Sequence, residues 1–480
     1  MPSSLYSENR ILMRDVYSGS ILTWHPKTFV LVLLIFLALW LLPSGVFFVS
    51  VILSIHALRG AKESIQALTI LSILILLNPG LFPTVYQWST LRWIVLSAAF
   101  GRMLWDGIIQ SAPTPITLIR PLYVFGLSVV VLALISSHDP LISIFKITAF
   151  TIGVSTVMTS FHRTAHLRDY WISWLFTVSL AVIVASLPLY LSSFGYFRNG
   201  IGFQGILNHP QTYGPFAAPF TALLTSLILF RKDYSRLVIL GASLGWIAIF
   251  TSLARTGLVM ATIGILLAAF CHVLSSRRFP KPRTRARSVP AFVLGLMILG
   301  IVVVAYGDQI LSASSTFILK QDSGGKSASF EIRKLKLPNQ LENFATAPLS
   351  GIGFGVDIDP ESFQNSDIGR TTMFGIPTGA PTEKSFLPTA ILEETGIIGA
   401  SLTILLIISL VRPVYAQGDL AALSVLISCL LINIAEIAFF SFGGIGLYIW
   451  IMTGLSYNMS VGISIPSLIG SQFKPSGKSL

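Results

Sequence analysis

The chain has 480 residues, of which 53% are hydrophobic and only 11% carry a charge, and its mean hydropathy is +0.77. These values exclude a soluble globular domain and indicate an integral membrane protein. The formal net charge of +12 lies mostly in loops between apolar segments, and this distribution argues against nucleic acid as a partner.

The apolar segments predict an all-α, polytopic membrane helix bundle. A hydrocarbon core of about 30 Å is crossed by about 20 helical residues, and these segments lack the alternation of membrane-spanning strands. Residues 1–27 contain no short apolar core followed by a small-residue cleavage site, so we expect no cleaved signal peptide. About fourteen transmembrane helices are expected, at 28–43, 45–58, 66–83, 91–106, 118–136, 141–160, 171–191, 213–230, 236–252, 256–275, 290–307, 386–411, 419–438 and 443–463.

The loops between these segments predict the orientation of the bundle. Counted alternately from an inside N-terminus, the inner loops include "RGAKESIQ", "FHRTAHLRDY", "RKDYSR" and "SSRRFPKPRTRARS". Such an excess of Lys and Arg in short loops marks the cytoplasmic side, so both termini are expected there. The last and most basic of these loops is expected to face membrane lipids.

Two hydrophilic outer loops interrupt this single transmembrane domain, which spans residues 1–480. The smaller loop covers 192–212 and the larger covers 308–385. A loop as long as the second is usually functional or disordered. Within it, "FEIRKLKLPNQLENFA" predicts an amphipathic helix along the outer surface, broken or restarted at Pro338, because proline fits a first helical turn better than an interior.

Charged residues at membrane depth are costly, so each is expected either to be paired or to belong to a site. Arg255 lies in the short outer turn of "TSLARTGLVM", where it either anchors a helix end or directs a planar fork of donors at a phosphate. Arg92, Arg102 and Lys146 are weaker candidates for substrate contact. Arg102 is expected to pair with Asp106, one helical turn further on.

The stretch "PLSGIGFG" places glycines at every second position, namely Gly351, Gly353 and Gly355. The first of them follows Arg333 by eighteen residues. Glycine permits a tight turn and a close approach of the backbone. The spacing differs from that of a dinucleotide-binding fold, and no strand and helix of such a unit flank it, so nucleotide binding is excluded. The stretch is either a loop returning to the membrane or a turn that sets the long loop over a cavity.

In "TEKSFLPTAILEETGIIGA" the last outer residues enter a helix. Glu383 and Lys384 are expected at the rim, and Glu393 and Glu394 lie about 10 to 12 Å further along the helix. Ionised carboxylates at that depth cannot face lipid comfortably, so at least one is expected to pair structurally with an arginine of a neighbouring helix. Two glycines of this stretch allow close helix contact, Gly396 and Gly399.

Four of these pieces occur in an order that resembles a known family. "RNGIGFQGILNHPQTYG" is similar to a segment before a mid-chain helix, and "SLARTG" to a Ser-x-x-Arg-x-Gly turn. Arg333 with "APLSGIGFG" resembles an arginine followed by Pro-Leu-x-Gly-x-Gly-x-Gly, and "FLPTAILEETGIIGA" resembles a closing Glu-x-Gly-x-x-Gly helix start. Over roughly 192 to 411, the chain resembles the O-antigen ligase and O-antigen polymerase superfamily of bacterial membrane glycosyltransferases.

The resemblance implies transfer of a glycan from a polyprenyl (undecaprenyl) diphosphate carrier, without metal or cofactor, to a hydroxyl of another glycan or a lipid. It implies that this transfer takes place at the periplasmic face of the inner membrane. Arg255 and Arg333 match the arginines that the family uses for the diphosphate, and Arg198 in the smaller loop is a further candidate.

The family's histidine before the closing helix is missing here. Its position is nearest to Glu383, which is followed by Lys384 and Ser385. Either Glu383 is the base, or Lys384 is a positive group for the phosphate, or the acceptor chemistry differs. Fixed guanidinium groups in a poorly solvated cavity stabilise the charge of a leaving diphosphate. One base and one displacement predict inversion at the anomeric carbon.

Histidines and cysteines give little sign of other chemistry. His209, in "NHPQTYG", is the only histidine expected on the outer side near this region, and with Pro210 after it we interpret it as shaping the loop rather than as a catalyst. The histidines are scattered, no Asp or Glu cluster occurs, and Cys271 and Cys429 lie in apolar segments. These features predict neither a metal site nor a disulfide framework.

The missing histidine favours a polysaccharide polymerase over a ligase to a lipid acceptor, and a transporter or flippase for lipid-linked sugars remains the alternative of another class. Carriers tend to contain internal repeats with broken helices, and no such repeat is visible. The expected partners are the lipid-linked oligosaccharide, a glycan or lipid acceptor, membrane lipids and other proteins of polysaccharide assembly.

Overall fold

A computed structural model describes residues 22–42, 45–197, 202–274, 328–356, 386–434 and 436–461. Regular structure in these residues is helical, apart from an isolated bridge between Leu77 and Leu207, which confirms the all-α class for this part of the chain. The α-helices are α2 (Pro26–Leu41), α3 (Gly45–Ala57), α4 (Ala61–Ile75), α5 (Trp88–Ile108), α6 (Ile116–Ser136), α7 (Pro140–Arg163), α8 (Arg168–Ser186), α9 (Pro210–Ser226), α10 (Arg236–Ser252), α11 (Arg255–Leu274), α14 (Ala328–Thr346), α16 (Leu387–Gln417), α17 (Leu420–Leu431) and α18 (Ile445–Val461).

Every predicted membrane segment that falls within the described residues overlaps one of these helices, whereas 290–307 lies outside the described residues. Several apolar helices of this kind indicate a membrane protein. The expected number of about fourteen membrane crossings stays a prediction. In the described part, five helical stretches are long and apolar enough to cross a membrane: Ile116–Ser136, Pro140–Arg163, Ala165–Leu191, Pro210–Arg231 and Leu387–Gln417.

Several predicted boundaries are wrong: for example, α16 continues to Gln417 instead of ending at 411, and α17 ends at Leu431 instead of at 438. α4 ends at Ile75 instead of continuing to 83, because Asn78 starts a turn in which its side-chain oxygen accepts from the N–H of Gly80 (2.9 Å). The predicted break at Pro338 does not occur, and this proline lies inside α14. Pro338 is exposed, and α14 continues through it although a proline cannot donate the helical hydrogen bond at its position.

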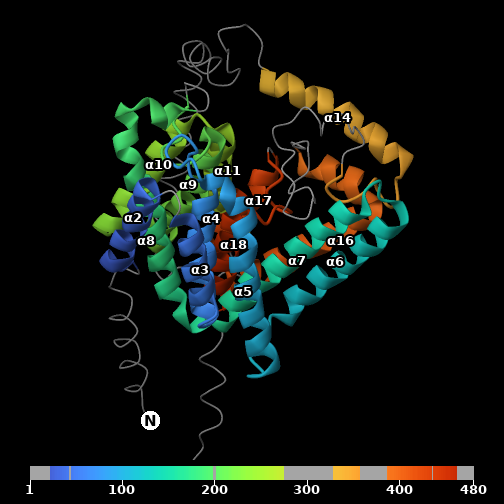
Figure 1. The fold of residues 1–480 in the computed structure, drawn as a ribbon, viewed down its shortest axis with the longest axis horizontal. Coiled ribbons are helices and arrows are strands. Elements are labelled where there is room, and N and C mark those ends of the chain that lie inside the picture. Colours follow the sequence, from blue (N-terminus) through green and yellow to red (C-terminus); the bar gives the residue numbers. More distant parts are fainter. Residues whose placement is uncertain are drawn as a thin grey trace, which may run out of the picture.

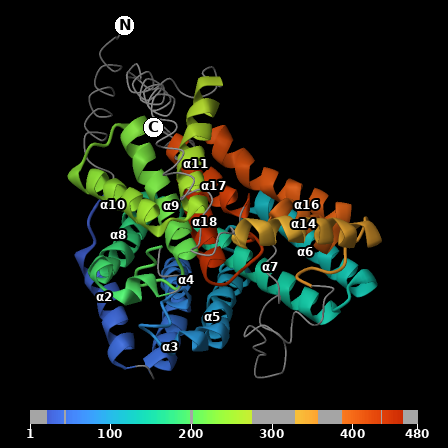
Figure 2. The ribbon, with the colours of Figure 1, turned by 90° about the horizontal axis from the view of Figure 1, so that it is seen from above.

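The helices pack around two clusters of buried side chains. α6, α7 and α16 lie together on one side of the molecule, and α2 to α5 with α8 to α11 form the other (Figure 1). The larger cluster fills the second group together with α17 and α18, and the smaller lies between α6, α7, α16 and α18. α14 lies across the outer surface of α16 (Figure 2).

At one end of the bundle, two buried aspartates join loops that were predicted to lie on the inner side. The ion pair of Asp106 with Arg102 confirms the predicted pairing within α5. The remaining ion pairs show that alternate loops meet at one end of the bundle. The pairs are Asp106 with Arg102 (2.7 Å) and Arg163 (3.7 Å), and Asp419 with Arg168 (2.8 Å) and Arg231.

Candidate functional site

The candidate site is built on an interruption of α16. Gly396 has φ 63° and ψ −166°, so the helix breaks there. In an uninterrupted helix the N–H groups of Ile397 and Ile398 would donate to the carbonyls of Glu393 and Glu394. The break releases these two donors and two acceptors, and buried backbone groups require other partners.

The glycine-rich turn, residues 348–356, supplies those partners. The N–H groups of Ile352 and Gly353 donate to the carbonyls of Glu393 (2.9 Å) and Glu394 (3.1 Å). In return, the N–H groups of Ile397 and Ile398 donate to the carbonyls of Pro348 (2.9 Å) and Leu349 (3.3 Å). The turn is thus inserted into the break of α16 and replaces the hydrogen bonds of the helix.

Glycine is required at the contact between the two segments. Gly351 has a φ of +71° and Gly396 a φ of +63°, a region that residues with a Cβ rarely adopt. A Cβ on Gly351 would also overlap the backbone of Glu394, and one on Gly396 would overlap the backbone of Leu349. The two glycines therefore allow two backbones to approach more closely than side chains permit.

The insertion holds two buried carboxylates beside the turn. Glu393 is 2% exposed, and its Oε1 accepts from the Nδ2 of Asn343 in α14 (2.8 Å). Glu394 is 5% exposed, and its Oε2 lies 3.4 Å from the Nζ of Lys146 in α7. The cation beside Glu394 is thus a lysine, where sequence analysis expected an arginine. Helices α7, α14 and α16 meet at this point.

The loop before α7 closes the site from another direction. The N–H of His138 donates to the carbonyl of Ile352 (3.0 Å), and the His138 side chain is exposed. Gly353 packs so closely on Ser137 that a Cβ would overlap its hydroxyl, which lies 2.9 Å from the hydroxyl of Ser143. Sequence analysis missed this loop because it lies about two hundred residues before the turn and carries no motif.

An aromatic cluster anchors the far side of the turn. Phe354 is 1% exposed, and its ring centroid lies 5.2 Å from that of Phe440 and 6.3 Å from that of Phe125. The Nζ of Lys146 lies 4.7 Å from the centroid of the Phe354 ring. The turn therefore belongs to the smaller buried cluster, and burial of these rings fixes its position.

Two other motifs of the family resemblance are also brought together. The N–H of Phe203, in the smaller outer loop, donates to the carbonyl of Thr251 near the end of α10 (3.0 Å). α11 begins at Arg255, which is half-buried. α9 and α11 approach closely, since a Cβ on Gly257 would lie 2.6 Å from the carbonyl carbon of Gly214.

The structure assigns His209 a local role in this loop. Its Nδ1 accepts from the N–H of Gln211 (3.0 Å), which caps α9. This agrees with the interpretation that the residue shapes the loop. The expectation that His209 is the only outer histidine near the site is wrong, because the backbone of His138 contacts the glycine-rich turn directly.

Several predicted site residues lie outside the described residues, namely Arg198, Glu383 and Lys384. Arg333 lies in the first half of α14, in a stretch whose side chains are also outside the described part. The convergence of Arg255 and Arg333 on one diphosphate therefore stays a prediction. Across the described residues, no group of three or more His, Cys, Asp and Glu side chains is placed to hold a metal ion.

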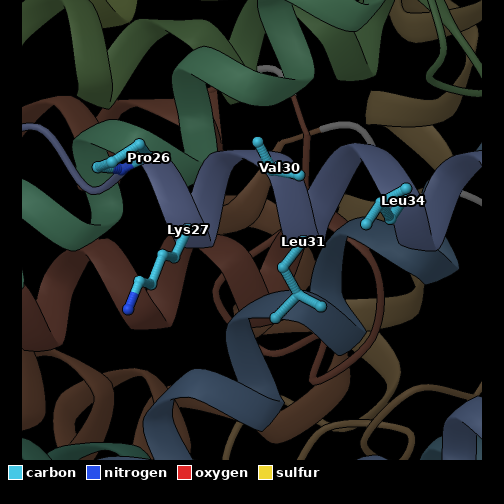
Figure 3. Close-up of a pocket in the computed structure, with 5 residues that line it drawn as sticks. All are labelled: Pro26, Lys27, Val30, Leu31 and Leu34. Carbon is cyan, nitrogen blue, oxygen red and sulfur yellow. The ribbon is translucent and has the colours of Figure 1, made fainter.

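An open groove of about 450 Å³ lies on the surface of α2, away from these motifs (Figure 3). Its lining side chains all come from one helix, and the aliphatic ones are at least half exposed. Such a face suits contact with lipid chains. The lining residues are Pro26, Lys27, Val30, Leu31 and Leu34.

In comparisons with known proteins, no protein-family model and no curated protein matches the chain. The described fold and site define an all-helical protein with apolar helices and a buried acidic pair at an interrupted helix.

Proposed function

We propose that the protein is a membrane glycosyltransferase that moves a glycan from a polyprenyl diphosphate carrier to a hydroxyl of another glycan or a lipid. Within this class, we propose a polysaccharide polymerase, with a ligase to a lipid acceptor as its closest alternative. The observation that carries the proposal is the insertion of the glycine-rich turn into the break of α16. It joins two motifs of the resemblance into one structural unit beside Glu393 and Glu394.

The reaction needs no redox partner. The acceptor oxygen attacks the anomeric carbon, the bond from that carbon to the diphosphate oxygen breaks, and the diphosphate leaves with the electron pair. The proton of the acceptor hydroxyl passes to a base on the protein. Attack from the face opposite the leaving group inverts the configuration.

Positive groups at the outer end of the bundle are proposed to bind the diphosphate. Arg255 and Arg333 are the main candidates, with Lys384 and Arg198 as additional ones. A guanidinium presents a planar fork of donors that matches phosphate oxygens. Fixed charges of this kind stabilise the leaving group without reorganisation.

The base is proposed to be Glu383, which precedes α16 by a few residues. His138 is a second candidate because it is exposed and its backbone is bonded to the turn. Glu393 and Glu394 are assigned a supporting role. Their partners, Asn343 and Lys146, tie α14 and α7 to α16 beside the turn.

We further propose an inner-membrane protein with about fourteen crossings, cytoplasmic termini and a periplasmic site. The ion pairs of Asp419 support this topology, because they join two loops rich in Lys and Arg, through Arg168 and Arg231, at one end of the bundle. The glycine-rich turn contacts the loop between α6 and α7, which alternation along the chain places on the opposite side. Other envelope-assembly proteins and membrane lipids are the proposed partners.

A carrier for the same lipid-linked sugars is the second candidate, and the broken helix α16 favours it. Interrupted helices often expose backbone groups to a transported substrate. Here the released groups of Glu393, Glu394, Ile397 and Ile398 are bonded to the turn, which leaves them unavailable to a substrate. We therefore prefer the enzyme.

The test uses purified protein in lipid nanodiscs, supplied with a polyprenyl-diphosphate oligosaccharide in the presence of a metal chelator. We expect longer glycan and released polyprenyl diphosphate, and Arg333→Ala is expected to abolish both. Arg120→Ala changes an exposed arginine of α6 and serves as the matched control. Unchanged substrate with folded protein contradicts the proposal, and transport without elongation in proteoliposomes would favour the carrier.

A further inference from the structure

Two loops at the outer end of the bundle form one unit. The loop between α4 and α5, residues 76–87, contacts the loop between α8 and α9, whose described parts are 187–197 and 202–208. The side chain of Asn78 is buried between them, and its Nδ2 donates to the carbonyl of Phe194 (2.8 Å). We call these three stretches the outer platform.

The length of α4 places the outer platform at membrane depth. The 15 residues of this helix rise about 22 Å, whereas a hydrocarbon core is about 30 Å thick. The Nζ of Lys62 lies 4.1 Å from the centroid of the Tyr170 ring, so α4 and α8 start at one level, at the end where the basic inner loops meet. With that level at the inner boundary, Ile75 ends the helix about 8 Å short of the outer boundary. The outer platform, which follows directly at Leu76, therefore begins within the hydrocarbon.

The sequence of the outer platform suits this depth because it is uncharged. No charged side chain occurs between Glu63 and Arg92, and none occurs between Asp169 and Arg198. Charged groups at membrane depth are costly, so a segment that lies there is expected to lack them. By contrast, α14 exposes Glu342, which suits a helix in contact with water.

The backbone of the outer platform also meets the requirement of a lipid environment. Non-helical backbone at membrane depth needs hydrogen-bond partners within the protein. The N–H of Gly195 donates to the carbonyl of Ser192 (3.1 Å), and the N–H of Gln204 donates to that of Gly195 (2.8 Å). Between the two loops, the N–H of Asn78 donates to the carbonyl of Ile206 (2.8 Å). These bonds satisfy polar groups that lipid cannot satisfy.

Large apolar side chains on the outer platform are exposed. Leu191 is 97% exposed, so it packs against almost nothing in the protein. The hydroxyl of Tyr190 lies 2.7 Å from that of Thr251 in α10, next to the exposed ring of Phe250. This contact makes the exposed surface continuous with an apolar helix face. The exposed apolar and aromatic residues of the outer platform are Tyr86, Leu187, Leu191, Phe194 and Phe197.

We propose that the outer platform is embedded in the outer leaflet of the membrane, where its exposed side chains contact lipid chains. The sequence predicted a hydrophilic loop over 192–212, whereas this proposal assigns the described start of that loop to the membrane domain. The proposal does not depend on the glycosyltransferase activity.

Nitroxide labels on single cysteines, in protein reconstituted into lipid nanodiscs, test the proposal. Cys271→Ala provides the background, because Cys429 is buried. Collision of each label with oxygen, which concentrates in lipid, is compared with collision with a water-soluble nickel chelate. The labels on the outer platform are placed at Leu191→Cys and Phe197→Cys.

Two further labels provide the reference values. Ile404→Cys lies on an exposed apolar face of α16, and Glu342→Cys lies on the exposed face of α14. We expect the ratio of oxygen to nickel collisions at Leu191→Cys and Phe197→Cys to be close to that at Ile404→Cys and well above that at Glu342→Cys. The physical reason is that a charged chelate does not enter the hydrocarbon.

Two results would overturn the proposal. A collision ratio on the outer platform equal to that at Glu342→Cys would place the platform in water. Protection of both platform labels from both reagents would show that protein covers this surface, and spectral broadening between labels would identify a second copy as the cover. If Phe197→Cys fails to fold, Leu191→Cys decides the matter, because that side chain packs against almost nothing.

Discussion

Replacement of Gly396 by alanine tests the insertion of the glycine-rich turn into α16. The φ of 63° and ψ of −166° belong to a region that is essentially restricted to glycine, so alanine costs about 1–3 kcal/mol there. The added Cβ also meets the backbone of Leu349 and Ser350. Alanine favours the uninterrupted helix by about 1 kcal/mol, and that helix would take back the carbonyls of Glu393 and Glu394. The total effect on the inserted state is roughly 2–4 kcal/mol.

Hydrogen exchange measured by mass spectrometry is the direct assay. Release of the turn is expected to speed exchange of the amides of Ile352 and Gly353, and thermal unfolding should shift to a lower temperature. Gly101→Ala in α5 is the control, because a Cβ there meets nothing within 4 Å. Unchanged exchange at residues 348–356 in Gly396→Ala would refute the reasoning, whatever the effect on global stability.

Three further predictions concern the charged groups. Lys146→Met removes the cation beside Glu394 and leaves that carboxylate buried, so it should lower the free energy of unfolding by roughly 2–4 kcal/mol. A double-mutant cycle with Glu394→Gln that finds no coupling between the two residues would contradict this prediction. Asp419→Asn should destabilise the bundle by a similar amount, roughly 2–4 kcal/mol, in a thermal unfolding measurement in which exposed Asp169→Asn is nearly neutral. In the glycan-transfer assay Glu383→Gln should lower the rate about a hundredfold and His138→Ala much less, and the reverse order would assign the base to His138.

Local patterns in the sequence were sufficient for much of the fold. Apolar run length predicted the helices, because burial in hydrocarbon requires about 20 such residues in succession. The spacing of Arg102 and Asp106 predicted their ion pair, since residues four apart lie on one face of a helix. Boundaries were less accurate where one side chain ends a helix, as Asn78 does after α4.

The amino-acid sequence by itself determined that this is a helical protein with apolar helices, and it marked the glycines and carboxylates of the candidate site. It did not determine what those residues contact. Only the tertiary structure decided that the glycine-rich turn fills the break at Gly396, that Lys146 is the cation beside Glu394, and that the backbone N–H of His138 donates to the turn. The physical reason is that such contacts depend on how distant helices pack, and a pattern within one segment carries no information about which distant backbone or charge will meet it.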